Sequence, residues 1–343
     1  MRVLVSRTDR IGDVVLTLPL CGLLRAHLGA EVLFLARRYT RPVVEASPFV
    51  DAVLDWDAVA TGSGDRQRDF LRELRADVIL HVFPRREVAR AARAAGIPRR
   101  IGTSHRFYHW LYCNELEHFS RRRSQRHEAQ LNARLAAPLL RRVDWDVAEL
   151  TPFCRLEPQV PVPPRVAALL EGSRFNLVAH PKSRGSGREW PLEHWAALIA
   201  ALPEADYRVF ITGSPEERHE LREWLRTLPP QVVDLTSSLN LAELVALLAA
   251  ADGVVAASTG PLHVAAAAGA NTLGLFPPTP PIHPARWGPL GPRAVSLSAP
   301  RACSGCGSGR AGSERCQCMR AIPVRAVVER VEAWARAVRR RAG

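Results

Sequence analysis

Residues 253–276, GVVAASTGPLHVAAAAGANTLGLF, constrain the fold of this chain more than any other stretch. The apolar run Gly253–Ala257 predicts a buried strand, and the small residues at 262–268 predict a helix that ends at Gly269. A second apolar strand is expected at 272–276. A strand, a helix and a second strand in this order are typical of a parallel sheet covered by helices.

The turn Ser258-Thr259-Gly260-Pro261 between the first strand and the helix suits an anion. Thr259 and Gly260 lie at the expected helix N-terminus, where unpaired N–H groups and the helix dipole favour negative charge. Gly260 has no Cβ, so a phosphate can approach the backbone closely. An ordinary strand-to-helix turn of an α/β domain is the alternative, and the pattern alone does not separate the two.

Alternating strands and helices occur twice along the 343 residues, which predicts two domains. A proline-rich segment, 152–164, is the expected linker because proline resists both helices and central strands. We therefore predict an α/β fold of two Rossmann-like, doubly wound domains, 1–157 and 165–322, facing each other across a cleft. The expected strands are 3–6, 31–36, 52–54, 77–83, 175–180, 207–212, 232–235 and 294–297, and the expected helices are 12–27, 41–46, 65–75, 87–95, 125–142, 192–202, 216–228, 240–250 and 323–341.

The excess of basic residues indicates either a negatively charged partner or a surface that is rich in arginine for no functional reason. Lys and Arg number 47 against 34 Asp and Glu, a formal charge of +13. Nucleic acid, an anionic membrane surface and an acidic substrate are all candidate partners, and an arginine-rich surface without a partner is the alternative. No zinc finger, aromatic RNA-binding strand or basic heptad region is present, so nucleic acid is not expected. The basic clusters at 121–123 and 336–341 fit a membrane surface at least as well.

The apolar segments predict a cytoplasmic protein. The best candidate for a membrane span, 244–257, is interrupted by Asp252. Asp9 and Asp13 lie where a signal peptide would have an uninterrupted apolar core.

Two further turns carry residues suited to chemistry. Gly12 would allow a tight turn after the first strand, and Asp13, at the start of the next helix, could take a proton from an attacking hydroxyl. A helix cap is the alternative, and position alone favours it. Residues 179–191 place Lys182 and Arg188 among small residues, a composition that suits a loop closing over a diphosphate but is also common in loops without a ligand.

Several motifs occur in order over nearly the whole chain. They are Gly12-Asp13-Val14-Val15-Leu16-Thr17-Leu18-Pro19, Arg188 two residues before Trp190-Pro191, Thr259-Gly260-Pro261-Leu262-His263-Val264-Ala265-Ala266, Pro278-Thr279-Pro280-Pro281, Trp287-Gly288-Pro289 and Cys318-Met319-Arg320-Ala321-Ile322. Each motif is modest alone, but the ordered set resembles the lipopolysaccharide heptosyltransferase family, glycosyltransferase family nine.

The resemblance implies a glycosyltransferase of the GT-B fold that transfers heptose from ADP-heptose to a lipopolysaccharide core acceptor with inversion. The first domain would bind the acceptor, with Arg10 and Gly12 in the acceptor-side turn and Asp13 as the general base. The second would bind the nucleotide sugar, and the segment 323–343 would pack back toward the first domain. No cofactor is implied beyond the donor. Donor-binding residues would be Lys182, Arg188, Ser258, Thr259, Gly260 and His263, with Glu216 or Glu217 at the ribose unless these two acids only stabilise a helix N-terminus.

One departure from the family pattern leaves the donor open. Members usually carry Asp immediately before the Thr-Gly or Ser-Gly pair, and this chain has Ser258. The alternatives are a related transferase with another nucleotide sugar or acceptor, and a basic nucleotide- or nucleic-acid-binding protein without activity. The expected partners remain a nucleotide sugar and an acidic lipid-linked glycan, with the protein peripheral to the inner membrane.

Four cysteines, Cys303, Cys306, Cys316 and Cys318, have the spacing C-x2-C-x9-C-x-C. Four thiolates could hold zinc or iron, but the one-residue final spacing is unusual for zinc. We favour a reduced structural loop without metal. Cys21, Cys113 and Cys154 are expected to be packing residues.

Overall fold

The chain divides into two compact units, Met1–Glu157 and Pro158–Gly343. The structure is a computed structural model that describes residues 1–121, 124–170, 172–303 and 317–342. The boundary between the units falls inside the proline-rich segment 152–164 that we expected to be a linker. Each unit is built around its own sheet.

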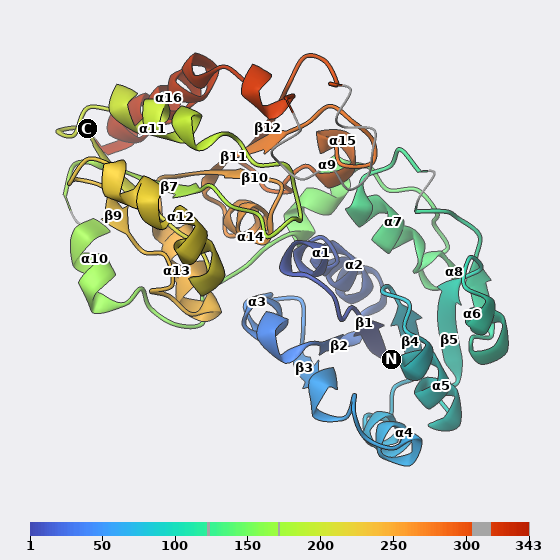
Figure 1. Ribbon diagram of the computed structural model, residues 1–343. Helices are drawn as coiled ribbons and strands as arrows, with labels where there is room; N and C mark the ends of the chain where they lie inside the picture. Colours follow the sequence, from blue (N-terminus) through green and yellow to red (C-terminus); the bar gives the residue numbers. More distant parts are fainter. Residues whose placement is uncertain (122–123, 171, 304–316, 343) are drawn as a thin grey trace. The chain divides into compact units, whose positions relative to one another are not determined.

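The first unit contains a six-stranded parallel sheet in the order β3-β2-β1-β4-β5-β6 (Figure 1). Central strand β1 is apolar because it is covered on both faces, and its Leu4 pairs with Leu33 on one side and Ile79 on the other. The strands are β1 Arg2–Ser6, β2 Glu31–Ala36, β3 Ala52–Asp55, β4 Val78–His81, β5 Arg99–Thr103 and β6 Glu115–Glu117. The helices are α1 Ile11–Val15, α2 Leu18–Leu28, α3 Arg41–Glu45, α4 Gly64–Glu73, α5 Arg86–Ala94, α6 Phe107–Tyr112, α7 Glu128–Arg134, α8 Ala137–Leu140 and α9 Val147–Leu150.

The second unit repeats this plan with the order β12-β11-β10-β7-β8-β9, again all parallel. Its strands are β7 Phe175–His180, β8 Tyr207–Ile211, β9 Val233–Asp234, β10 Gly253–Ala257, β11 Asn271–Phe276 and β12 Ala294–Ser298. Its helices are α10 Pro164–Leu170, α11 Leu192–Ala201, α12 Pro215–Thr227, α13 Leu241–Ala250, α14 Gly260–Ala267, α15 Pro284–Trp287 and α16 Val324–Ala342.

In both units the strands follow the doubly wound order 3-2-1-4-5-6 when numbered within the unit. The chain reverses direction across the sheet between β1 and β4, and again between β7 and β10. Ligands of such sheets bind at these reversals, beyond the carboxyl ends of the strands. The predicted α/β class with two doubly wound sheets is confirmed.

Two predicted helices are each divided in the structure. The helix expected at 12–27 is α1 and α2, separated at Leu16 and Thr17. The Thr17 hydroxyl donates to the Asp13 carbonyl at 2.8 Å, and Pro19 begins the first turn of α2, where no N–H is required. The helix expected at 125–142 is likewise α7 and α8.

Strands β5 and β6 and helix α6 were missed by the sequence prediction. Both strands lie toward the edge of the sheet and carry charged residues, so neither shows an apolar run. Arg99 of β5 pairs with Glu115 of β6 at 2.6 Å, an interaction between charges that a hydrophobicity pattern cannot reveal.

Among the described residues, the one helical stretch long and apolar enough to cross a membrane is 11–28, rather than the expected 244–257. It has the length and hydropathy of a membrane span, but 61% of it is buried inside the protein. Seven consecutive residues of α2, Leu18 to Leu24, are buried. Packing in the core of the first unit therefore accounts for the apolar character of this stretch.

Helix α16 packs against α11 of the second unit. Its residues Val327, Val331 and Trp334 belong to the same apolar core as Trp195 of α11. The apolar face of this last segment therefore lies in the core of the second unit, and its expected packing toward the first domain stays a prediction.

Candidate active site

In the second unit, two loops meet at the reversal between β7 and β10. The strands pair so that Ala256 lies opposite His180, and their following loops therefore leave the sheet together. The Ser186 hydroxyl of the first loop donates to the Ser258 carbonyl of the second at 3.2 Å. A Cβ on Gly187 would lie only 2.5 Å from that carbonyl oxygen, so this approach requires glycine.

Helix α14 begins at this junction, as predicted for Thr259 and Gly260. Thr259 is the extended N-cap residue (φ −145°), and within the described chain its hydroxyl caps none of the helix N–H groups. Gly260 is half-buried and Pro261 follows in the first turn. His263 lies one turn further on and is buried. Because α14 is buried along its length, its dipole acts with little screening by solvent.

Lys182 is clamped between two carboxylates that the sequence prediction missed. Its Nζ lies 2.7 Å from Glu189 and 2.8 Å from Glu220. Partial burial lowers the pKa of Lys182, but the hydrogen bonds to Glu189 and Glu220 more than offset this effect, so its pKa lies above the usual value. Lys182 is also the only lysine in the sequence, in which arginine supplies every other cationic side chain apart from histidine.

Glu189 also organises the loop around Lys182. It accepts hydrogen bonds from the Ser183 backbone N–H at 2.9 Å and from the Ser183 hydroxyl at 3.0 Å. Arg188, the other predicted cation, is half-buried in the same loop. The loop after β7 therefore holds Lys182 and Arg188 in an ordered hydrogen-bonded turn.

Glu217 has the structural role that we weighed as the alternative to ribose binding. It is buried at the start of α12, and its carboxylate accepts a hydrogen bond from the Ser214 N–H at 2.8 Å. The Ser214 hydroxyl in turn accepts from the Glu217 N–H at 3.2 Å, completing a capping box. Burial raises the pKa of Glu217. Glu216 is exposed and accepts a hydrogen bond from the Ser214 hydroxyl at 2.7 Å, so of the two acids it is the one accessible to a ligand.

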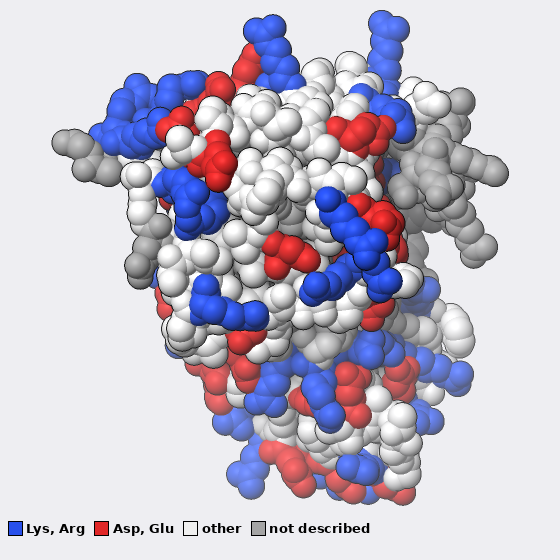
Figure 2. Space-filling view, turned by 60° about the vertical axis from the view of Figure 1, so that its left-hand side comes forward, with Lys and Arg blue, Asp and Glu red and all other residues white. Residues whose placement is uncertain are grey.

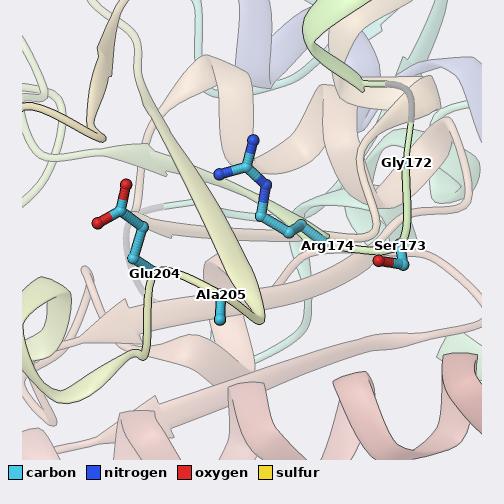
Figure 3. Close-up of a pocket in the computed structure, with 5 residues that line it drawn as sticks. All are labelled: Gly172, Ser173, Arg174, Glu204 and Ala205. Carbon is cyan, nitrogen blue, oxygen red and sulfur yellow. The ribbon is translucent and has the colours of Figure 1, made fainter.

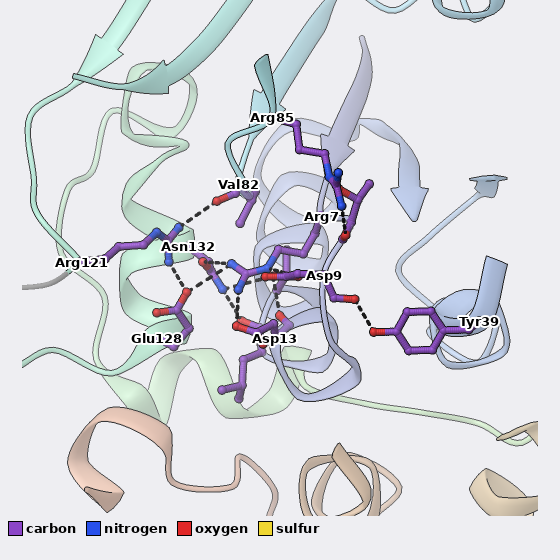
Figure 4. A network of polar contacts seen from close by, with 12 residues as sticks. Arg7, Asp9, Asp13, Tyr39, Val82, Arg85, Arg121, Glu128 and Asn132 are labelled. Carbon is purple, nitrogen blue, oxygen red and sulfur yellow. Dashed lines mark hydrogen bonds and ion pairs between the residues drawn. The ribbon is translucent and has the colours of Figure 1, made fainter. Parts of the chain in front are cut away.

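In the first unit, a charged network surrounds Asp13 (Figure 4). Arg7, the residue after β1, is buried and pairs with Asp9 at 2.8 Å and Glu128 at 3.2 Å. Its guanidinium also forms an ion pair with Asp13, which lies in the first turn of α1 with 21% of its side chain exposed. Asp13 is therefore both oriented by Arg7 and accessible.

Helix α7 supplies the far side of this network. Glu128 and Asn132 are one turn apart on α7 and both contact Arg7. The Asn132 amide also donates to the Leu16 carbonyl at 2.9 Å, at the break between α1 and α2. Arg121 pairs with Glu128 as a second cation. The segment that carries Asp13 is thus tied to α7 by buried polar contacts.

The network changes the pKa values of Asp9 and Arg7. Burial raises the pKa of Asp9 to about 6; Arg7 opposes this shift, and the nearby negative charge of Asp13 adds to it. Burial lowers the pKa of Arg7, but Asp9, Asp13 and Glu128 together raise it above the usual value, so Arg7 stays charged.

Other contacts fix the turn after β1. Arg85, from the loop after β4, donates to the Thr8 hydroxyl at 2.7 Å and to the Thr8 carbonyl at 3.1 Å. Arg10 is the exposed N-cap residue of α1. Gly12 is the second residue of α1 and does not have a positive φ, so the turn between β1 and α1 does not use the conformational freedom of this glycine.

The cysteine prediction is only partly covered by the structure. Cys306 and Cys316 lie outside the described residues. The Cys303 N–H donates to the Cys318 sulfur at 2.9 Å, and no group of three or more candidate metal ligands occurs among the residues that the structure describes. Cys21, Cys113 and Cys154 are buried as expected of packing residues, and burial raises the pKa of Cys154 to about 12.

A surface depression in the second unit lies at the wrong edge of the sheet for such a site (Figure 3). Its lining residues precede β7 and β8: Gly172, Ser173, Arg174, Glu204 and Ala205. These are the amino ends of the strands, whereas ligands of doubly wound sheets bind at the carboxyl ends.

Comparison with known proteins gives the family. The model of glycosyltransferase family 9 (heptosyltransferase) matches residues 66–312. The chain is 28% identical to a putative glycosyltransferase of Haemophilus influenzae, with 84% of this chain and 86% of that protein covered. It is 26% identical to lipopolysaccharide heptosyltransferase 1 of Pseudomonas aeruginosa, with 89% and 86% covered.

Solved structures agree in fold. The Escherichia coli ADP-heptose LPS heptosyltransferase II superposes with a TM-score of 0.75 at 21% identity, covering 99% of this chain and 100% of that chain. A family 9 glycosyltransferase of Veillonella parvula superposes with a TM-score of 0.76 at 17% identity, covering 97% of both chains. The predicted family is confirmed: the chain belongs to glycosyltransferase family 9 and is a glycosyltransferase.

Proposed function

We propose that this enzyme transfers heptose from ADP-heptose to a lipopolysaccharide core acceptor with inversion at the anomeric carbon. The observation that carries the donor assignment is the N-terminus of α14, which begins beside the Gly187 loop at the carboxyl edge of the second sheet. The names of relatives support the sugar and acceptor, since they include a lipopolysaccharide heptosyltransferase and a structure of an E. coli heptosyltransferase with an ADP-heptose analogue.

The second unit would hold the donor diphosphate. N–H groups of the first turn of α14 offer hydrogen bonds to phosphate oxygens, and the helix dipole favours their negative charge. Arg188 adds positive charge from the loop after β7, and Lys182, whose own charge is compensated by Glu189 and Glu220, would hold that loop in place at the donor. Together these groups would stabilise the charge that develops on ADP as it leaves.

Asp13 would act on the acceptor as a general base. The acceptor oxygen attacks the anomeric carbon while the bond from that carbon to the β-phosphate oxygen breaks. The acceptor proton passes to the Asp13 carboxylate, and ADP departs with the bonding electrons. The ion pair with Arg7 fixes the orientation of the carboxylate, and its partial exposure allows a sugar hydroxyl to reach it.

The acceptor and its location follow from the same proposal. An acidic, lipid-linked glycan would be reached from the cytoplasm by a protein peripheral to the inner membrane, with the basic surface attracting it. Over the face in Figure 2, Lys and Arg side chains alternate with Asp and Glu instead of forming one continuous basic track. This distribution favours local lipid contacts over a nucleic-acid groove on that face.

Ser258 motivates the second candidate, a transferase with another nucleotide sugar or acceptor. Its carbonyl contacts the loop after β7, but its side chain lacks the carboxylate that the family usually has before the Thr-Gly pair. A panel of nucleotide sugars offered to the purified enzyme, with product mass as the readout, separates the candidates. Transfer from a different donor alone would overturn the heptose assignment, and salt-dependent nucleic-acid binding without any transfer would favour a non-catalytic protein.

The first prediction concerns the base itself. Asp13→Asn should lower kcat by at least about 10²-fold, because a positioned base contributes that much, while ADP affinity changes by less than about twofold. The measurement is turnover with ADP-heptose and truncated core acceptors, together with ADP calorimetry. Glu31→Gln, which removes a surface ion pair with Arg2, is the matched control. Turnover of Asp13→Asn at the wild-type rate would refute the role of Asp13.

A further inference from the structure

Helix α6 presents an apolar face to solvent. Phe107, Trp110 and Leu111 are 71%, 62% and 55% exposed and lie at helical positions i, i+3 and i+4. His109, on the opposite side of this short helix, is fully buried. The Trp110 indole N–H donates to the Ser104 carbonyl at 3.0 Å, which fixes the ring while leaving it exposed. Large exposed apolar side chains gathered on one face mark a contact surface.

Exposed arginines continue from this face along the solvent side of α5, and one of them contacts α6. Arg86, Arg90 and Arg93 lie at positions i, i+4 and i+7 of α5, on the side opposite its buried Val88. Arg106 immediately precedes α6. Helices α5 and α6 are in contact, and the Arg93 side chain donates to the Leu111 carbonyl at 2.5 Å.

The positive charge of these arginines is not compensated nearby. Among the residues that the structure describes, no carboxylate lies within 4 Å of Arg86, Arg90, Arg93 or Arg106; the ion pairs there involve other residues. Elsewhere on the surface, Arg41, Arg68 and Arg325 each pair with an acid of their own helix.

We propose that the α5–α6 patch, formed by Arg86, Arg90, Arg93, Arg106, Phe107, Trp110 and Leu111, docks the enzyme on an anionic phospholipid surface. Aromatic rings settle at the boundary between headgroups and acyl chains, and nearby arginines are attracted to lipid phosphates. A second copy of the chain is disfavoured as the occupant, because a two-fold contact through the patch would bring like charges together. A protein partner would need carboxylates facing all four arginines.

The inference deepens the proposed function by locating the membrane contact on the first unit, which also carries Asp13. The purpose of this membrane contact rests on the proposed lipid-linked acceptor. The experiment that tests the contact does not. Vesicle binding requires no donor, no acceptor and no turnover. The two proposals can therefore fail separately.

The test is co-sedimentation of the full-length protein with vesicles of phosphatidylglycerol and phosphatidylcholine, compared with phosphatidylcholine alone. We expect binding to the anionic vesicles that weakens as salt rises, because the attraction is screened. Phe107→Ser with Trp110→Ser, and separately Arg86→Gln with Arg106→Gln, should each lower the partition coefficient by about tenfold or more. Arg86 and Arg106 suit this test because each is exposed and contacts no carboxylate among the described residues.

Two controls match these changes. Val143→Ser removes an apolar side chain that is 49% exposed outside the patch, and Arg41→Gln with Arg325→Gln removes the same amount of charge from α3 and α16. Both should bind vesicles as the wild type does. Circular dichroism verifies folding of each variant, and turnover of a soluble truncated acceptor should be unchanged in all of them.

Several results would overturn the proposal. They are absence of wild-type binding to anionic vesicles, equal loss in the charge control, or unchanged binding of both patch variants. A wild-type dimer in solution that the patch variants convert to monomer would assign the patch to self-association instead. Vesicle binding through the patch by a protein that transfers no heptose would support the membrane contact and contradict the proposed function.

Discussion

Lys182 differs chemically from every other strongly basic residue of the chain, because all the others are arginines. Its compact ammonium fits between Glu189 and Glu220 at 2.7 and 2.8 Å. A planar guanidinium is larger and presents its donors in a fixed fork, so the clamp should not accept arginine unchanged. The geometry therefore favours lysine over arginine at this position, although the chain has arginine at every other position of this charge class.

We expect Lys182→Arg to weaken ADP binding by about tenfold, since the larger side chain would disturb the Glu189 turn that carries Arg188. Calorimetry with ADP measures the change. Arg184→Lys, an exchange at an exposed position of the same loop, should bind ADP normally. Wild-type affinity in Lys182→Arg would remove Lys182 from the donor site.

Two buried histidines end central strands, His81 in β4 and His180 in β7. Burial lowers the pKa of His81 to about 3 and that of His180 to about 4, so both are neutral in the folded enzyme at neutral pH. The unfolded chain takes up these protons near pH 6.5, so the free energy of unfolding should fall as pH drops from about 6.5 to about 4. The slope is at most about 1.4 kcal/mol per pH unit for each histidine.

His81→Leu should reduce this pH dependence and raise stability near pH 7 by about 1–3 kcal/mol. Within the described residues neither ring nitrogen of His81 has a hydrogen-bond partner, and removing a buried unsatisfied polar group is favourable. Urea unfolding at several pH values measures both effects, with the exposed His219→Gln as the control. A His81→Leu variant that is less stable at pH 7 and equally pH-dependent would contradict this account.

At the scale of elements, the approach of the loops after β7 and β10 depends on Gly187. Gly187→Ala would place a methyl group 2.5 Å from the Ser258 carbonyl oxygen and push the loops apart. We expect ADP affinity to fall by about tenfold, with overall stability changed by less than about 2 kcal/mol because the loop is at the surface. Ser186→Ala, which removes the hydroxyl contacts to the Ser258 carbonyl at 3.2 Å and to the Ser183 carbonyl at 2.7 Å but adds no clash, should have a smaller effect on calorimetric affinity. Normal ADP binding by Gly187→Ala would show that the loops need not touch.

The elements also show what a sequence can reveal. Strand β10, the turn at Ser258 and helix α14 were predicted because they are contiguous and their apolar pattern is strong. The buried pair of Arg7 and Glu128 joins residues 121 positions apart, and no local pattern signals it. Glu189 follows Arg188 directly in the sequence, whereas Glu220 of α12 is brought to Lys182 only by the fold. Long-range charge pairing is set by topology, whereas strands and turns are set locally.

At the scale of the whole molecule, each unit has its own parallel sheet and its own apolar core. The proposed nucleotide-binding groups, from Lys182 to His263, all belong to the second unit. We therefore expect residues 158–343, expressed alone, to fold and to bind ADP within about tenfold of the full-length affinity while catalysing no transfer. Circular dichroism and calorimetry check this. A folded fragment without ADP affinity would mean that the first unit contributes to the nucleotide site.

At one border of each sheet, β9 and β6, the outermost strand has a consequence beyond catalysis. β9 is two residues long and β6 is three, and β6 carries two glutamates. A border this short exposes few unpaired backbone groups, and charge there repels an incoming chain. At these two borders the sheets therefore offer little template for fibril growth.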